Sequence, residues 1–176
     1  MDIFEASERL MAMDDAAWER HAHPASVYTR MLLGLPLLVA AIWSRTWIGW
    51  WALAAVAAVA AFTWANTRMT PRPASTDNWA SKATFGERVL LARDAVPIPA
   101  HHRVMANRLT ALAAAGVPFL AWGLWALDPW PTAFGMALVY AGKLWFLDRM
   151  VWLYDDMRRV EPRYEAWLRR PVSDGG

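Results

Sequence analysis

The sequence predicts an all-α membrane protein in which four transmembrane helices form two tight hairpins, with amphipathic interfacial helices on the cytoplasmic side. Apolar residues make up 57% of the chain and charged residues 19%, and the two kinds are segregated along it. Four apolar stretches each approach the ~20 residues that cross a ~30 Å hydrocarbon core. The chain also has 13 tryptophans, many near the ends of these stretches, and tryptophan favours the membrane–water interface.

The apolar stretches divide the chain into five segments. A soluble bundle with buried helices is the alternative, but stretches that are apolar on every side argue against it. The expected order is an amphipathic N-terminal segment, a transmembrane hairpin, a polar loop with an amphipathic helix, a second transmembrane hairpin and a basic tail. These segments cover 1–27, 28–66, 67–107, 108–154 and 155–176.

Each hairpin is expected to reverse in a very short turn. The first pair of stretches, 28–44 and 47–66, is separated only by Ser44, Arg45 and Thr46. The second pair, 109–127 and 130–150, is separated by Asp128 and Pro129. Pro36 lies inside the first stretch, where its missing N–H and its ring predict a kink.

The distribution of basic residues predicts the orientation. Arg45 is the only Lys or Arg in the two turns, and Lys143 lies inside the fourth stretch. The other 16 of the 18 basic residues fall before, between and after the hairpins, or at their adjoining ends. Because positive loops stay inside, both termini and the central loop are expected in the cytoplasm of a multi-pass protein.

The central loop should form an amphipathic helix over about 78–94, capped by Thr76 or Asp77. One interpretation lays this helix on the membrane surface. Its apolar side would then dip into the interface and its basic side would meet headgroups. The other interpretation turns its polar side chains inward, over the mouth of the bundle. The apolar side chains are Trp79, Phe85, Val89 and Leu90, and the polar ones are Asp77, Asn78, Lys82, Glu87 and Arg88.

Five polar motifs resemble an uncharacterised family of small bacterial and haloarchaeal membrane proteins, a domain of unknown function. They are HAHPASVYTR (21–30), STDNWASK (75–82), GERV (86–89), VPIPAHHR (96–103) and GKLWFLDRMVWLYDDM (142–157). The resemblance implies a bacterial or archaeal cytoplasmic membrane. It implies no activity, so the function has to be argued from the residues.

A divalent metal site is one hypothesis for the cytoplasmic face, because imidazole and carboxylate groups suit zinc, manganese or non-haem iron. No established ligand spacing is present. His101 and His102 are adjacent, and neighbouring side chains on a regular helix point about 100° apart, so we do not expect both to face one ion easily. The alternative is histidines that contact headgroups. The candidate ligands are His21, His101, His102, Asp148 and Asp155.

The other candidate site residues are ionisable or polar groups near the same face. Lys143 is the one well inside a span; it either snorkels to the interface or pairs with Asp148, Tyr140 or a loop carboxylate. Candidate catalytic groups are Glu87, Asp148, Lys143 and Lys82. Candidate groups that bind a lipid or another ligand are Arg88, Arg103, Arg149, Trp79 and Asn78.

Composition excludes several functions. The chain has no cysteine, which excludes disulfides, thiolate metal sites and cysteine nucleophiles. The expected partners are the bilayer, anionic headgroups that attract the basic tail, and another membrane protein or a second copy, but no nucleic acid. The preferred function is an accessory subunit or a binder of lipid or a hydrophobic cofactor. The alternatives are a metal-dependent enzyme acting on a lipid or isoprenoid at the membrane surface, and a small oligomeric transporter or channel.

Overall fold

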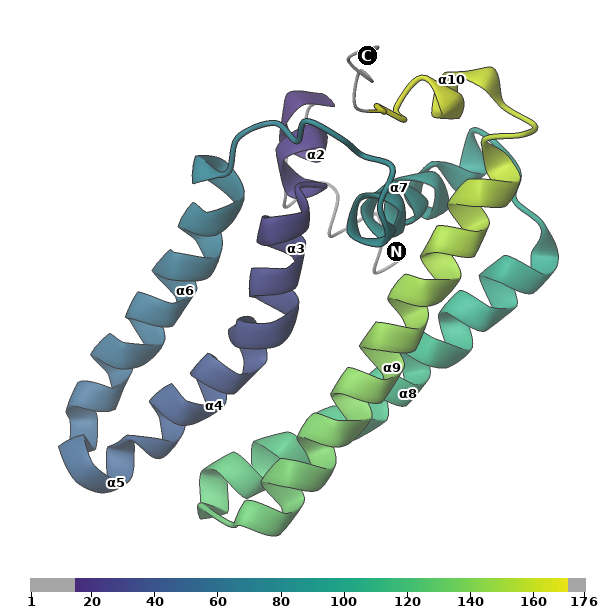
Figure 1. Ribbon diagram of the computed structural model, residues 1–176. Helices are drawn as coiled ribbons and strands as arrows, with labels where there is room; N and C mark the ends of the chain where they lie inside the picture. The colour runs from purple at the N-terminus through teal and green to yellow at the C-terminus, as the bar shows by residue number, and fades with distance from the viewer. Residues whose placement is uncertain (1–14, 171–176) are drawn as a thin grey trace.

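The computed structural model describes residues 15–170 and is helical throughout, with no strand in that range (Figure 1). Most of the expected N-terminal amphipathic segment and the last six residues of the tail lie outside the described residues. One end of the molecule holds the chain reversals of both helix pairs, and we call it the turn end. The opposite end holds α2, α7 and α10, and we call it the α7 end.

The first apolar stretch forms a bent helical run. It follows α2 (Asp15–His21) and consists of α3 (Pro24–Thr29), a π-helical turn (Arg30–Gly34) and α4 (Leu35–Trp43). A proline ring collides with the carbonyl four residues earlier, and the π turn relieves such a collision by inserting one residue into the helix. The irregularity expected at Pro36 therefore lies in the turn just before it.

The chain then reverses over a longer segment than expected. α5 (Arg45–Ile48) and a 3-10 turn (Gly49–Trp51) precede α6 (Ala52–Met69), which returns beside α4. Gly49 has a φ of 57°, which a side chain would disfavour. The second helix thus begins at Ala52 and not near residue 47. The tryptophans of this segment belong to the turn end instead of the helix.

The second pair of helices packs closely along its length. α8 (Ala100–Ala126) and α9 (Pro129–Met157) are joined by Leu127 and Asp128, and Asp128 caps α9 by accepting a hydrogen bond from the Trp130 amide. Glycines allow the close approach. A Cβ at Gly142 would lie 2.5 Å from the Ala113 nitrogen, and one at Gly123 would lie 2.3 Å from the Thr132 nitrogen.

Helix α7 (Trp79–Leu91) crosses α9 at the α7 end. Its N-cap is Asn78, whose side chain accepts from the Ser81 amide, and not Thr76 or Asp77. Its apolar side lies in the main core: Phe85, Val89 and Leu90 are buried among the side chains of Met150, Leu153 and Tyr154. Of the two interpretations of this helix, the one in which these three residues dip into the lipid interface is wrong for this reason. Burial against α9 removes their apolar surface from any solvent.

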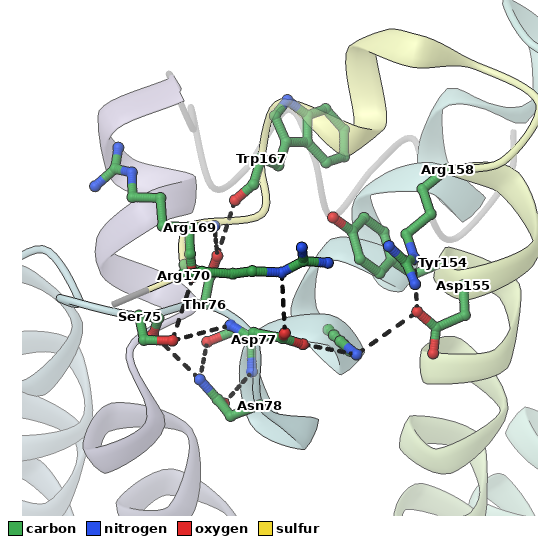
Figure 2. Close-up of polar contacts among 12 residues, drawn as sticks. Ser75, Thr76, Asp77, Asn78, Tyr154, Asp155, Arg158, Trp167, Arg169 and Arg170 are labelled. Atoms are coloured by element: carbon green, nitrogen blue, oxygen red, sulfur yellow. Dashed lines mark hydrogen bonds and ion pairs between the residues drawn. The ribbon is translucent and has the colours of Figure 1, made fainter. Parts of the chain in front are cut away.

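The C-terminal segment, with α10 (Pro162–Glu165), folds back onto the central loop. Figure 2 shows Thr76 at this junction. Its hydroxyl donates to the Trp167 carbonyl at 2.9 Å and accepts from the Arg169 amide at 2.6 Å, while its own amide donates to the Arg169 carbonyl. Several arginines of the tail form ion pairs within the protein. The pairs are Arg158 with Asp155 and Glu165, Arg169 with Glu19, and Arg170 with Asp77.

Two helical runs are long and apolar enough to cross a membrane: Pro24–Met69, which includes the reversal, and Ala100–Ala126. Only 6% and 22% of their most apolar windows are buried, whereas the core helix of a soluble protein is mostly buried. Five tryptophans near the turn end are 76–88% exposed: Trp47, Trp50, Trp51, Trp125 and Trp130. Soluble proteins rarely expose so much contiguous apolar surface.

Candidate functional site

A cavity of about 230 Å³ lies where the first helix pair meets α7 and α9. Its walls come from the end of α2, the α3–α4 run, α7 and the middle of α9. The lining residues are His21, Val27, Arg30, Met31, Leu35, Thr84, Glu87, Val139, Tyr140, Lys143 and Leu147. The wall combines apolar side chains with several polar groups that converge on the cavity, a composition that ligand sites often have.

Arg30 and His21 form one polar side of the cavity. Arg30 Nη1 donates to His21 Nδ1 at 2.7 Å, and Nη2 donates to the His21 carbonyl at 3.1 Å. Because guanidinium can only donate, Nδ1 must accept, so the imidazole proton sits on Nε2. Burial, followed by the nearby Arg30 charge, lowers the pKa of His21 to about 4. His21 is therefore neutral at pH 7.

Lys143 and Glu87 form the other polar side. Lys143 Nζ lies 2.6 Å from Glu87 Oε1, so the partner of Lys143 is the loop carboxylate and not Asp148. Tyr140, one turn earlier on α9, donates from its hydroxyl to the Met31 carbonyl at 2.9 Å. That carbonyl lies in the π turn, where the regular helical hydrogen bonds are interrupted.

The charges of the cavity do not balance. Glu87 pairs with Lys143 and its charge also acts on Arg30, and His21 is neutral. No carboxylate of residues 15–170 lies within ion-pair distance of the half-buried Arg30. Among the described residues of the cavity, two cations therefore share one carboxylate, and one positive charge is left over. Burying an uncompensated charge is costly, so such a charge is commonly matched by a bound group.

A second polar cluster connects α7 to the C-terminal end of α9 and to the tail (Figure 2). Lys82 lies 2.9 Å from Asp77 and 3.7 Å from Asp155, and Asp155 also pairs with Arg158 at 2.9 Å. The hydrogen bond from Lys82 lowers the pKa of Asp77, and the hydrogen bond to Glu165 raises the pKa of Arg158. Of the candidate residues, Lys82 and Asp155 thus lie within ion-pair distance of each other. Asn78 caps the N-terminus of α7. These contacts hold the fold together.

The three histidines among the candidate ligands divide between two places. His21 lines the cavity, whereas His101 and His102 lie at the start of α8 beside the end of α9. The rings of His101 and His102 are 4.1 Å apart, and His102 Nε2 is 2.9 Å from Asp156 Oδ2. The expected divergence of the two adjacent histidines is wrong. Asp156, and neither Asp148 nor Asp155, is the carboxylate beside them.

The remaining candidates do not converge. Arg88 lies over the Trp167 ring at 4.2 Å, and Arg149 lies over Trp152 at 4.8 Å. Asp148 is 3.9 Å from its neighbour Arg149. Trp79 stacks on Tyr28, and Arg103 is exposed on α8.

The candidate site residues did not include Arg30 or Asp156, and Tyr140 was expected only as a partner of Lys143. Arg30 carried a usable signal, because it is a charge at the edge of an apolar stretch. Asp156 adjoins the chosen Asp155, and only the helix phase separates the two.

Comparison with known proteins gives a family but no activity. No curated protein and no solved structure matches the chain significantly. The model of a family of unknown function, DUF6653, matches residues 5–170. This span includes both helix pairs, the cavity and the histidine cluster. The chain therefore belongs to the DUF6653 family, a family of unknown function.

Proposed function

We propose that this protein crosses the cytoplasmic membrane four times and holds an anionic amphiphile in the cavity at Arg30. In this topology the hairpins 28–66 and 108–154 are embedded, and the segments 1–27, 67–107 and 155–176 are cytoplasmic. The exposed tryptophans of the turn end support an interface there. α8 and α9, of 27 and 29 residues, extend over about 40 Å and 44 Å at ~1.5 Å per residue, enough for a ~30 Å core.

Arg45 is the exception to the charge asymmetry, and its contacts support the same topology. It donates from Nη2 to the carbonyls of Leu124 (2.9 Å) and Trp125 at the end of α8. These carbonyls lack helical partners, and the positive charge complements the helix dipole. Because Arg45 caps a neighbouring helix, its positive charge is compatible with a position on the non-cytoplasmic side of the membrane.

The topology can be tested directly because the chain contains no cysteine. We expect Thr46→Cys, in the exposed turn, to react with a membrane-impermeant maleimide on intact cells. Ala74→Cys, in the exposed part of the central loop, should react only after permeabilisation. Labelling of both residues, or of neither, in intact cells would contradict four spans with a cytoplasmic loop.

The observation that carries the ligand proposal is the excess positive charge of the cavity, where Arg30 forms no ion pair with a carboxylate of residues 15–170. An anionic headgroup would accept hydrogen bonds from Arg30 and approach Lys143. Leu35, Val139 and Leu147 belong to the proposed spans, so a hydrophobic chain held against them would run on into the bilayer. This combination favours a lipid-like ligand over a water-soluble anion, and a binding role over a purely accessory one.

The test compares Arg30→Gln with Arg68→Gln, which removes the same charge from an exposed arginine over Trp64 outside the cavity. Each protein is reconstituted in nanodiscs containing phosphatidylglycerol and phosphatidylcholine, and retained lipids are measured by native mass spectrometry. Losing a charged hydrogen bond of about 1.5–3 kcal/mol should lower phosphatidylglycerol retention roughly 10- to 100-fold in Arg30→Gln only. Equal retention in both variants and the wild type would refute the proposal.

The His101–His102–Asp156 cluster supports a second candidate, an enzyme dependent on a divalent metal that acts on a lipid or isoprenoid head. Three ligands would leave a coordination position for water or substrate. The cluster shares no residue with the cavity lining, so the two sites would not contact the same bound molecule. We therefore rank binding first. Turnover of a membrane lipid by zinc-loaded protein, lost in Asp156→Asn, would reverse that order.

A further inference from the structure

We propose that His101, His102 and Asp156 form a binding site for one transition-metal ion of the zinc class, independent of the Arg30 cavity. His101 and His102 lie in the first turn of α8, which begins at Ala100, and Asp156 lies in the last turn of α9. One ligand atom from each residue lies within 4.8 Å of the other two. The site would join the two ends of the second hairpin.

The three groups are close to a coordinating arrangement before any ion is added. Zinc bonds of about 2.0–2.1 Å in tetrahedral geometry place ligand atoms about 3.3 Å apart. His102 Nε2 and Asp156 Oδ2 are already 2.9 Å apart. His102 is 4% exposed and fixed by its surroundings, whereas His101 is exposed, so a side-chain rotation of His101 can complete the set without moving either helix.

The donor set selects the kind of ion. Two imidazole nitrogens and one carboxylate oxygen suit zinc, cobalt, nickel or copper better than magnesium or calcium, which prefer all-oxygen ligands. The chain has no cysteine to offer a thiolate. No further His, Asp or Glu of residues 15–170 belongs to the cluster, so the fourth position would hold water or an outside ligand.

The other carboxylates of α9 provide matched controls. Asp148 is on the same helix and at its surface, but it lies beside Arg149 and outside the cluster. Asp155 is held by Lys82 and Arg158. His23 is a histidine control at the opposite side of the fold, where its ring caps α3. We expect Asp156→Asn and His101→Ala to weaken metal binding, and Asp148→Asn and His23→Ala to leave it unchanged.

The experiment titrates Zn²⁺ into purified full-length protein that has been stripped with a chelator, with calorimetry as the readout. We expect one ion per chain, an affinity at least tenfold lower in His101→Ala and Asp156→Asn, and a change below twofold in Asp148→Asn and His23→Ala. Zn²⁺ should also raise the unfolding temperature of the wild type but not of Asp156→Asn, because the ion joins α8 to α9.

Electron paramagnetic resonance of the wild type loaded with one equivalent of Cu²⁺ keeps the test independent of any variant's folding. Superhyperfine coupling to two imidazole nitrogens, lost in His101→Ala, would support the site. Coupling to one nitrogen, absence of saturable Zn²⁺ binding, or equal affinity in His101→Ala and His23→Ala would overturn it.

Discussion

Replacement of Gly86 by alanine probes the contact that orients α7 on the bundle. A Cβ at this position would lie 1.9 Å from the Met150 carbonyl oxygen, 2.5 Å from its carbon and 2.8 Å from its Cα. All three are backbone atoms of α9, so no side chain can rotate away. Normal contact would require a shift of roughly 1.5 Å between the helices, and overpacking of this kind costs about 1–3 kcal/mol.

Gly34→Ala is the matched control, because nothing lies within 4 Å of a Cβ there and Gly34 is also helical. Alanine at that position should stabilise the helix by about 0.5–1 kcal/mol. Thermal unfolding followed by tryptophan fluorescence should therefore show a fall of roughly 2–10 °C for Gly86→Ala and a small rise for Gly34→Ala. Trypsin should also cleave α7 faster in Gly86→Ala. Equal stability of the two variants would refute the packing of α7 on α9.

Three further predictions concern pH, the turn end and the tail. The folded state disfavours protonation of His21, because its pKa is depressed to about 4. The free energy of unfolding should therefore be lower at pH 4.5 than above pH ~6.5, by about 2–3 kcal/mol. Thermal unfolding at both pH values measures this loss, and His21→Gln should reduce it. Arg45→Gln should destabilise the protein by about 1.5–3 kcal/mol, because the end of α8 loses its cap. Hydrogen exchange at the end of α8 should then be faster, and unchanged exchange would argue against the cap. Thr76→Val should release the tail to trypsin, whereas Thr76→Ser should not, because only the hydroxyl makes both contacts with residues 167 and 169.

The sequence was sufficient where composition or a single residue type dictates structure. Apolar stretches predicted helices, Pro36 predicted an irregular first helix, and Lys143 predicted an ionic partner from among the nearby groups. Asp128 and Pro129 also marked the start of α9 closely. In each of these cases the physical cause is local: a missing N–H, a desolvated charge or a helix cap.

The sequence was insufficient where the outcome depends on how helices dock. The apolar side of α7 suits lipid and protein equally well, and only the approach that Gly86 permits against Met150 decides between them. The choice of Asp156 over Asp155 depends on the phase of α9 relative to α8. Likewise, Arg30 meets His21 only because of the way α2 and α3 are oriented at their junction. These are tertiary facts that no local pattern contains.

The measurement that tests the central proposal most directly is a high-resolution structure of the protein purified in its native lipids. We predict an anionic headgroup within hydrogen-bond distance of Arg30, with its chain passing between Leu35 and Val139 toward the bilayer. A cavity filled only with ordered water, with bound lipids confined to the outer surface of the helices, would contradict the account.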